Sequence, residues 1–413
     1  MAKNIVICCD GTSNEFAKDH TNVVKLFWCL DHANPDAQVA YYHPGVGTME
    51  PPGAFTSVST ALTKLAGLAF GAFLLNDVRD AYVFLMNTYE PDDRVFVFGF
   101  SRGAYTARAL ASLLHLYGLI RRGNESLVPY ALRMMSATNN AGRGSKKQQA
   151  AANTIFDQAR EFRATFSVPC KLHFVGVWDT VSSVGWVTSP FHAPYTATNP
   201  DIAHGRHAMA MDEKRGFFPV SRWYPRAPEA GPLDVKQVWF AGDHCDVGGG
   251  HPEADCALSK IPLEWMVCEA VAQGLSVNRN LFDQVMGYAP VRNDYLGKDT
   301  WPFTKPSPAP KPHNSINLTS GMGWFWTVAE LFPRRKYNAK TNKWQLYWRP
   351  FGHKRVVPPQ GDGEAQPVVH EAAHLRGADY CRDLPAGVTF AKTDYPPQLR
   401  GTETEKARNP WVA

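Results

Sequence analysis

The pentapeptide Gly99-Phe100-Ser101-Arg102-Gly103 carries a potential nucleophile. It follows the apolar run 95–98 and precedes a helical pattern over 105–114. This strand–turn–helix context is that of a nucleophile elbow, in which a strained backbone presents a serine hydroxyl at the carboxyl edge of a sheet. Glycines flank the serine because larger side chains would collide with the neighbouring strand or helix. The pattern predicts Ser101 as the nucleophile of an acyl-transfer reaction.

A serine nucleophile needs a base to take its proton, and a histidine base needs an acid to orient it. Asp179 and His244 each follow an apolar stretch that predicts a strand, over 172–178 and 235–241. The chain order serine, acid, histidine is the order found on α/β-hydrolase sheets. We therefore expect a triad of Ser101, His244 and Asp179.

Other residues compete for the base and acid roles. His370 is an alternative base, and so is His207, although we expect His207 to be a helix residue of a cap. Asp246 is the main rival to Asp179 as the acid. It can instead hold the glycine-rich loop at 248–250 by hydrogen bonding.

An oxyanion hole needs two backbone donors. The N–H of Arg102, at the expected helix start, is one candidate. A loop after an earlier strand normally supplies the second. Gly11 permits a close backbone approach here, and Thr12 offers its N–H or hydroxyl. The alternative interpretation is an Asx turn, in which Asp10 and Asn14 bond their own backbone and cap the next helix.

The expected strands alternate with helical patterns along the chain. This alternation predicts an α/β-hydrolase-like fold with a mostly parallel, doubly wound sheet. The active site of such a sheet lies at the carboxyl ends of its strands, where the candidate residues fall. The strands are expected over 4–9, 38–42, 95–98, 172–178 and 235–241.

We expect a catalytic domain over 1–275 and a C-terminal extension over 276–413 that packs on it as a peripheral helical and aromatic subdomain. The stretch 185–232 separates two expected strands and is too long for an ordinary connection, so it predicts an inserted cap or lid. Aromatic clusters at 323–326 and 344–348 favour packing of the extension on the sheet, or else an acyl-binding wall.

Composition limits the classes of function that remain open to this chain. The 413 residues carry a net charge of +5, which is too mild to indicate nucleic-acid binding. The eight cysteines form no C-x-x-C pair and predict reduced thiols.

The N-terminus leads directly into a strand without a secretory signal, so we expect a cytoplasmic protein. The apolar stretch 61–75 is too short to span a bilayer, and it predicts a core helix or a flap that touches lipid.

Five motifs occur in this order along the chain: Cys9-Asp10-Gly11-Thr12, Gly45-Val46-Gly47-Thr48, Gly99-Phe100-Ser101-Arg102-Gly103-Ala104, Val177-Trp178-Asp179-Thr180 and His244-Cys245-Asp246-Val247-Gly248-Gly249-Gly250. Together they resemble the catalytic domain of the type VI secretion phospholipase effectors. The resemblance implies an α/β-hydrolase fold, a triad at Ser101, Asp179 and His244, and hydrolysis of carboxylic esters, with phospholipids as substrates. No obvious membrane-anchoring domain of the kind that large effectors carry is present, so a stand-alone esterase is equally compatible.

The leading hypothesis is a serine esterase that needs no metal or cofactor. Its expected partners are an ester or phospholipid substrate and a membrane surface, with no nucleic acid. Export by a secretion system that reads no cleavable signal is compatible with this sequence. One alternative is a metal-dependent phosphoesterase in which Asp10, His244 and Asp246 hold a cation. The other is a lipid-binding module without catalysis.

Overall fold

The computed structural model describes most of the chain. The described residues are 2–11, 19–45, 67–138, 146–181, 185–186, 189–190, 193–216, 218–224, 231, 233–293, 298–300, 302–314, 334–338, 343–347, 355–359 and 366–408. Thr12 and the aromatic cluster at 323–326 lie outside these residues, as do positions 46–66 with the first part of the apolar stretch.

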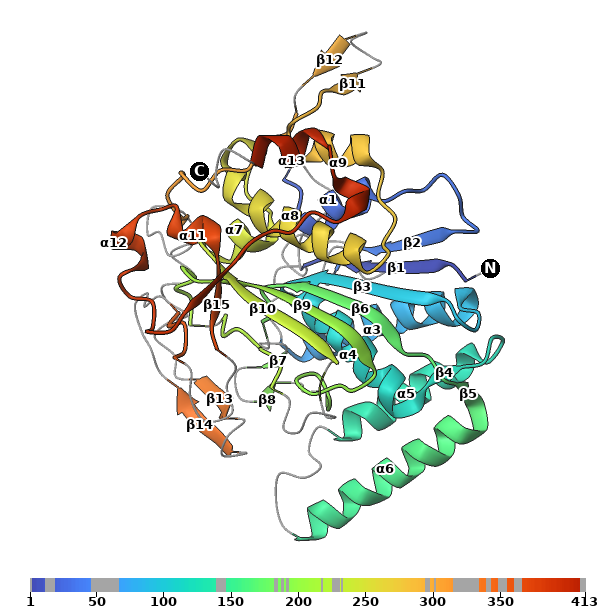
Figure 1. The fold of residues 1–413 in the computed structure, drawn as a ribbon. Helices are drawn as coiled ribbons and strands as arrows, with labels where there is room; N and C mark the ends of the chain where they lie inside the picture. The colour runs from blue at the N-terminus through green and yellow to red at the C-terminus, as the bar shows by residue number, and fades with distance from the viewer. Residues whose placement is uncertain are drawn as a thin grey trace, which may run out of the picture.

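An eight-stranded sheet forms the centre of the fold (Figure 1), in the order β16-β15-β10-β9-β6-β3-β1-β2. Every neighbouring pair in it is parallel. The expected parallel α/β fold is therefore confirmed. The strands are β1 (Asn4–Cys9), β2 (Gln38–His43), β3 (Arg94–Phe100), β6 (Leu172–Trp178), β9 (Ile202–Ala210), β10 (Asp234–Phe240), β15 (Val368–His370) and β16 (Thr389–Ala391).

Helices cover both faces of the sheet, and α3, α4, α5 and α6 lie on the opposite side from α1, α7, α8 and α9 (Figure 1). Their bounds are α1 (Asn22–Cys29), α3 (Gly67–Thr88), α4 (Arg102–Tyr117), α5 (Val128–Ala137), α6 (Lys146–Phe166), α7 (His244–Gly248), α8 (Ala257–Ala272) and α9 (Arg279–Val285). Short helices follow near the C-terminus: α11 (Glu371–His374), α12 (Ala378–Cys381) and α13 (Glu403–Arg408).

Small two-stranded ribbons lie outside the main sheet. The pairs are β4 (Leu119–Ile120) with β5 (Ser167–Val168), β7 (Gly185–Trp186) with β8 (Ser189–Pro190), β11 (Val291–Asn293) with β12 (Lys298–Thr300), and β13 (Arg334–Asn338) with β14 (Lys343–Tyr347). The aromatic cluster expected at 344–348 therefore falls largely on β14.

The strands β1 and β3 are buried on both faces beyond their first residue, which explains why they are continuously apolar rather than alternating. In β1, Ile5 and Ile7 pack with α3 and α4, whereas Val6 and Cys8 pack with α1 and α8. Successive side chains thus enter two separate cores. These two cores hold the carboxyl ends of the strands in place.

The strand order reverses at β1. The chain runs from β1 to β2 on one side and then returns through β3 on the other side of β1. In an open α/β sheet the crevice at such a switch point is the usual ligand site. Asp10 follows β1 and Ser101 follows β3, so both lie at this point.

The stretch 185–232 does not form a cap alone, because it contains β9, an inner strand between β6 and β10. The extension is likewise not wholly peripheral, since β15 and β16 lengthen the main sheet. The division of the chain into domains at residue 275 stays a prediction.

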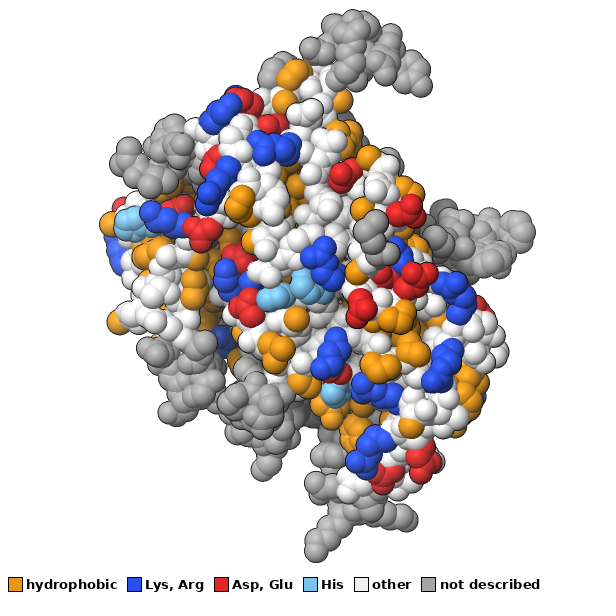
Figure 2. Space-filling model, turned by 45° about the vertical axis from the view of Figure 1, so that its right-hand side comes forward, with side chains coloured by type: hydrophobic (Ala, Val, Ile, Leu, Met, Phe, Trp, Pro, Cys, Tyr) orange, Lys and Arg blue, Asp and Glu red, His pale blue; other side chains and the backbone are white. Residues whose placement is uncertain are grey.

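Three properties bear on the function classes considered in the sequence analysis. No helix of the described residues is long and apolar enough to cross a membrane. The eight cysteines, which all lie within the described residues, form no disulfide bond. Figure 2 shows acidic and basic side chains interspersed over one face of the molecule, in keeping with the mild net charge of +5.

Candidate active site

Ser101 lies in a sharp turn between β3 and α4, with a backbone φ of 58° and ψ of −116°. Non-glycine residues seldom adopt this strained conformation. A Cβ added at Gly103 would lie 2.2 Å from the carbonyl oxygen of Cys9, and one at Gly99 would lie 2.4 Å from the oxygen of Gly103. The two glycines are therefore required where the turn packs against β1 and α4.

Ser101, His244 and Asp179 are joined by two short hydrogen-bonding contacts. The Nε2 atom of His244 lies 2.7 Å from Ser101 Oγ, and its Nδ1 atom lies 2.6 Å from Asp179 Oδ2. All three side chains are buried. They come from loops after β3, β6 and β10, which shows how a parallel sheet gathers residues distant in sequence at one edge.

Arg355 also contacts the carboxylate of Asp179. Its guanidinium donates to both oxygens, with N–O distances of 2.5 Å to Oδ1 and 3.0 Å to Oδ2. It also donates to the backbone oxygens of Ala210 and Phe218. Burial alone would raise the pKa of Asp179, but Arg355 and His244 outweigh this effect and hold the pKa well below its usual range.

The imidazole of His244 is held by its neighbours. The rings of Phe100 and Phe218 pack against it, with centroids 4.6 Å and 4.9 Å away. The carboxylate of Glu213 accepts a hydrogen bond from the His244 backbone N–H at 3.2 Å. Gly248 leaves room for Phe100, since a Cβ there would lie 1.9 Å from that ring. The glycine-rich loop thus helps to position the His244 ring.

A family model described as "T6SS, Phospholipase effector Tle1-like, catalytic domain" matches residues 3–269. The chain belongs to this family. The resemblance expected from the motifs is confirmed, and the three contacting residues all lie within the match. Arg355 lies beyond it.

One curated protein is similar to about half of this chain. The uncharacterized protein YEL023C of Saccharomyces cerevisiae is 36% identical over 224 residues, which are 52% of this chain and 32% of that protein. The chain thus spans about a third of the length of this curated relative.

Two solved structures resemble parts of the chain. An uncharacterized protein from Pseudomonas aeruginosa has a TM-score of 0.39 and 19% identity, and the similarity covers 67% of this chain and 46% of that one. The Tle1 effector bound to the VgrG spike of the type 6 secretion system has a TM-score of 0.31 and 17% identity, and the similarity covers 61% and 52% of the two chains.

The rival histidines of this Tle1-like chain have other partners. His207 lies on β9 rather than on a cap helix, and its ring nitrogens contact Arg108 and the Thr180 backbone N–H. Burial and the Arg108 guanidinium lower its pKa well below the usual range. His370 caps α11, and its Nε2 atom lies 3.1 Å from Thr393 Oγ1. The geometry favours His244 as the base.

The oxyanion donors are placed only in part. Arg102 opens α4, so its backbone N–H belongs to the helix end that attracts negative charge. The N–H of Gly11 donates to Asp10 Oδ1 at 2.6 Å, and Asp10 Oδ2 accepts from Thr21 and Tyr42. Asp10 therefore bonds the backbone of its own loop, but the residue that caps α1 is Thr21, and Asn14 lies outside the described residues. The roles of Gly11 and Thr12 as oxyanion donors stay predictions.

The three residues considered as cation ligands engage separate partners. Both ring nitrogens of His244 contact Ser101 and Asp179, and Asp10 bonds within its own loop. Asp246 accepts from the Asp243 backbone N–H in the capping box of α7. The geometry therefore gives no support to a shared Asp10–His244–Asp246 cation site.

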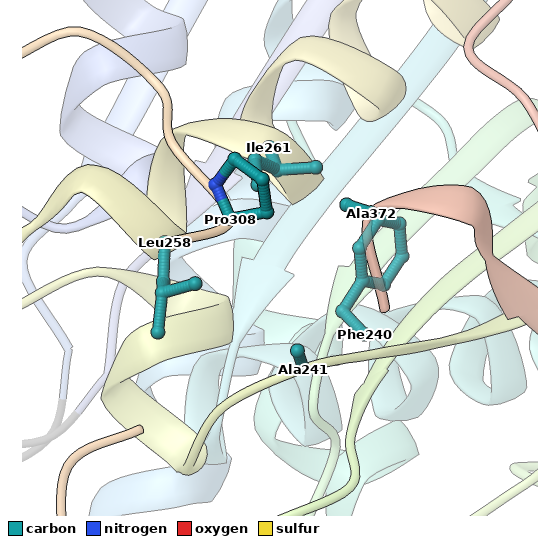
Figure 3. A pocket seen from close by; sticks show the side chains of 6 residues that line it. All are labelled: Phe240, Ala241, Leu258, Ile261, Pro308 and Ala372. Atoms are coloured by element: carbon teal, nitrogen blue, oxygen red, sulfur yellow. The ribbon is translucent and has the colours of Figure 1, made fainter. Parts of the chain in front are cut away.

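A small apolar hollow lies between the end of β10, α8 and the extension (Figure 3). No member of the Ser101–His244–Asp179 group lines it. We interpret it as packing between α8 and the extension. Its lining residues are Phe240, Ala241, Leu258, Ile261, Pro308 and Ala372.

Arg355 is the residue of this site that sequence reasoning missed. Its surroundings, Lys354-Arg355-Val356-Val357, form no motif. Its contact with Asp179 spans 176 positions. Such a long-range pairing leaves no local pattern from which it can be predicted.

Proposed function

We propose that the chain is a serine hydrolase that cleaves carboxylic esters, and that lipid or phospholipid acyl esters are its substrates. The observation that carries this proposal is the continuous contact from Ser101 Oγ through His244 to Asp179. The strained elbow at Ser101 supports it further, because a binding protein gains nothing from that strain. Membership of a phospholipase effector family supports the lipid substrate class.

The proposed reaction proceeds in two steps. Nε2 of His244 takes the proton of Ser101 while Oγ attacks the ester carbonyl. The resulting oxyanion faces the N–H of Arg102 at the start of α4. The imidazolium then gives its proton to the leaving alcohol. In the second step His244 activates water, which releases the carboxylic acid from the acyl-enzyme. These transfers use the chain's own side chains and need no cofactor.

Asp179 keeps the imidazole oriented during both steps. Arg355 donates to both oxygens of the carboxylate and the Ala210 backbone N–H donates to Oδ1, and these contacts hold the carboxylate ionised and in place. A carboxylate fixed from both sides cannot rotate away when His244 becomes charged. Arg355 is therefore proposed as a positioning residue that acts through Asp179.

The test uses a fluorophosphonate probe and a p-nitrophenyl ester series, followed by phospholipid vesicles, with the purified full chain. Labelling and turnover are expected in the wild type and are expected to vanish in Ser101→Ala. Ser126→Ala, a change at an exposed serine, serves as the matched control and should behave as the wild type. Full ester turnover by a folded Ser101→Ala variant would refute the mechanism. Ester turnover without release of fatty acid from vesicles would refute the lipid substrate class alone.

A further inference from the structure

A second cluster of polar side chains lies at α7, apart from the three contacting residues of the candidate active site. Asp243 and Asp246 form the capping box of this short helix. His251 follows the glycine-rich loop, and His313 comes from the segment 302–314 of the extension. Two parts of the chain that are far apart in sequence thus bring two imidazoles to two carboxylates.

The distances within this cluster are short. His313 Nδ1 lies 2.6 Å from Asp246 Oδ1. His251 Nε2 lies 3.3 Å from Asp243 Oδ1 and 3.8 Å from Asp246 Oδ1. Donor atoms of Asp246, His251 and His313 all lie within 4.8 Å of one another. The atoms therefore converge on one point rather than forming a chain of separate pairs.

The electrostatics of Asp246 call for a positive charge. Its side chain has no exposed surface, and within the described residues its ion-pair partners are the two imidazoles alone. The rings of His251 and His313 stack with centroids 3.8 Å apart, a poor arrangement for two imidazolium charges. A cation bound by both imidazoles would place positive charge beside this buried carboxylate.

We propose that Asp246, His251 and His313 bind one Zn²⁺ ion. Imidazole nitrogen and carboxylate oxygen are both zinc ligands, and three of them leave the fourth tetrahedral position to water. Bonds of about 2.0–2.1 Å place neighbouring ligand atoms about 3.3 Å apart. The distance of 3.8 Å between His251 Nε2 and Asp246 Oδ1 is close to this value. His313 Nδ1 and Asp246 Oδ1 have to separate by less than about 1 Å as the hydrogen between them is replaced by the ion.

The site is open enough for an ion to enter. The carboxylates are buried, whereas the side chains of His251 and His313 are 21% and 33% exposed. The ion would join the segment 302–314 to the helix that begins with His244. We infer that its role is structural: it fastens the extension beside the candidate active site and takes no part in the ester chemistry.

The test measures Zn²⁺ binding by the purified full chain after chelator treatment and dialysis. Isothermal titration and elemental analysis should give one tightly held ion per chain, and Zn²⁺ should raise the melting temperature. Co²⁺ in the same site should give the visible absorption of a tetrahedral complex. His313→Gln, which can keep a hydrogen bond to Asp246, should bind Zn²⁺ about 100-fold or more weakly.

Two further variants make the result decisive. His374→Ala alters an exposed histidine outside the cluster and should bind as the wild type does. The double variant His251→Ala/His313→Gln should have no tight site while its circular dichroism stays native. Equal Zn²⁺ affinity and stoichiometry in the wild type and this double variant would overturn the proposal, and so would a wild type that holds no Zn²⁺ at micromolar concentrations.

Discussion

Replacing Arg355 with methionine tests how far the extension controls the site. The guanidinium is 10% exposed and Asp179 is fully buried, so the pair belongs to the buried class rather than the surface class of ion pairs. Removing one partner of a buried pair costs about 3–5 kcal/mol, because the other charge stays buried. His244 and the Ala210 backbone N–H still contact the carboxylate, so we expect Arg355→Met to lower the free energy of unfolding by about 3 kcal/mol.

The assay combines urea unfolding with ester turnover. Loss of the support behind Asp179 is expected to reduce kcat by about 100-fold, as misplacement of a catalytic group by about 1 Å does. Added guanidinium at low millimolar concentration should restore part of kcat in Arg355→Met. Such rescue would not be expected if the variant had lost activity merely by unfolding.

The matched control is Arg382→Met. This arginine is 73% exposed and pairs with the exposed Asp379, so its loss should change stability by less than about 1 kcal/mol and leave kcat unchanged. The reasoning would be refuted if Arg355→Met unfolded within about 0.5 kcal/mol of the wild type and kept its kcat.

Two further substitutions test the elbow and its surroundings. Gly103→Ala places a Cβ 2.2 Å from the Cys9 carbonyl oxygen, so it should destabilise the fold by about 2 kcal/mol or more and abolish probe labelling; a normal melting temperature would contradict this. Burial and the carboxylate of Asp80 raise the pKa of Asp77 to about 7, despite the opposing charge of Arg102. The folded state therefore keeps a proton that the unfolded state releases near pH 4, so stability falls as pH rises from about 4 to about 7. Asp77→Asn should remove this fall, and its advantage over the wild type should grow by about 2–3 kcal/mol between pH 5 and pH 8 in urea unfolding; an equal advantage at both pH values would count against the burial argument.

The strands that carry Ser101, Asp179 and His244 were predictable because each is rich in apolar residues and is followed within a few positions by a polar residue. Once the strands are parallel, their carboxyl ends must meet at one edge. The placement of these residues thus followed from local signals, although their catalytic roles stay a proposal.

The strand β9 was missed for a physical reason. It contains His204, Arg206 and His207, which mask its pattern. Arg206 is buried on the sheet because Glu269 and Asp234 neutralise it. A sequence shows the charge but not the distant partner that permits its burial. For the same reason, the contact of Arg355 with Asp179 could not be predicted from the sequence.

The distance in sequence between the elbow strands and Arg355 has a consequence for synthesis. Residues up to 269, which contain Ser101, Asp179 and His244, leave the ribosome about 86 residues before Arg355. At about 5–20 residues per second, roughly 4–17 seconds pass between the two events. During that interval β10 is an open sheet edge without β15, and the buried acid lacks its guanidinium. The newborn chain is therefore expected to gain its activity late, and to be most prone to aggregation just before it does.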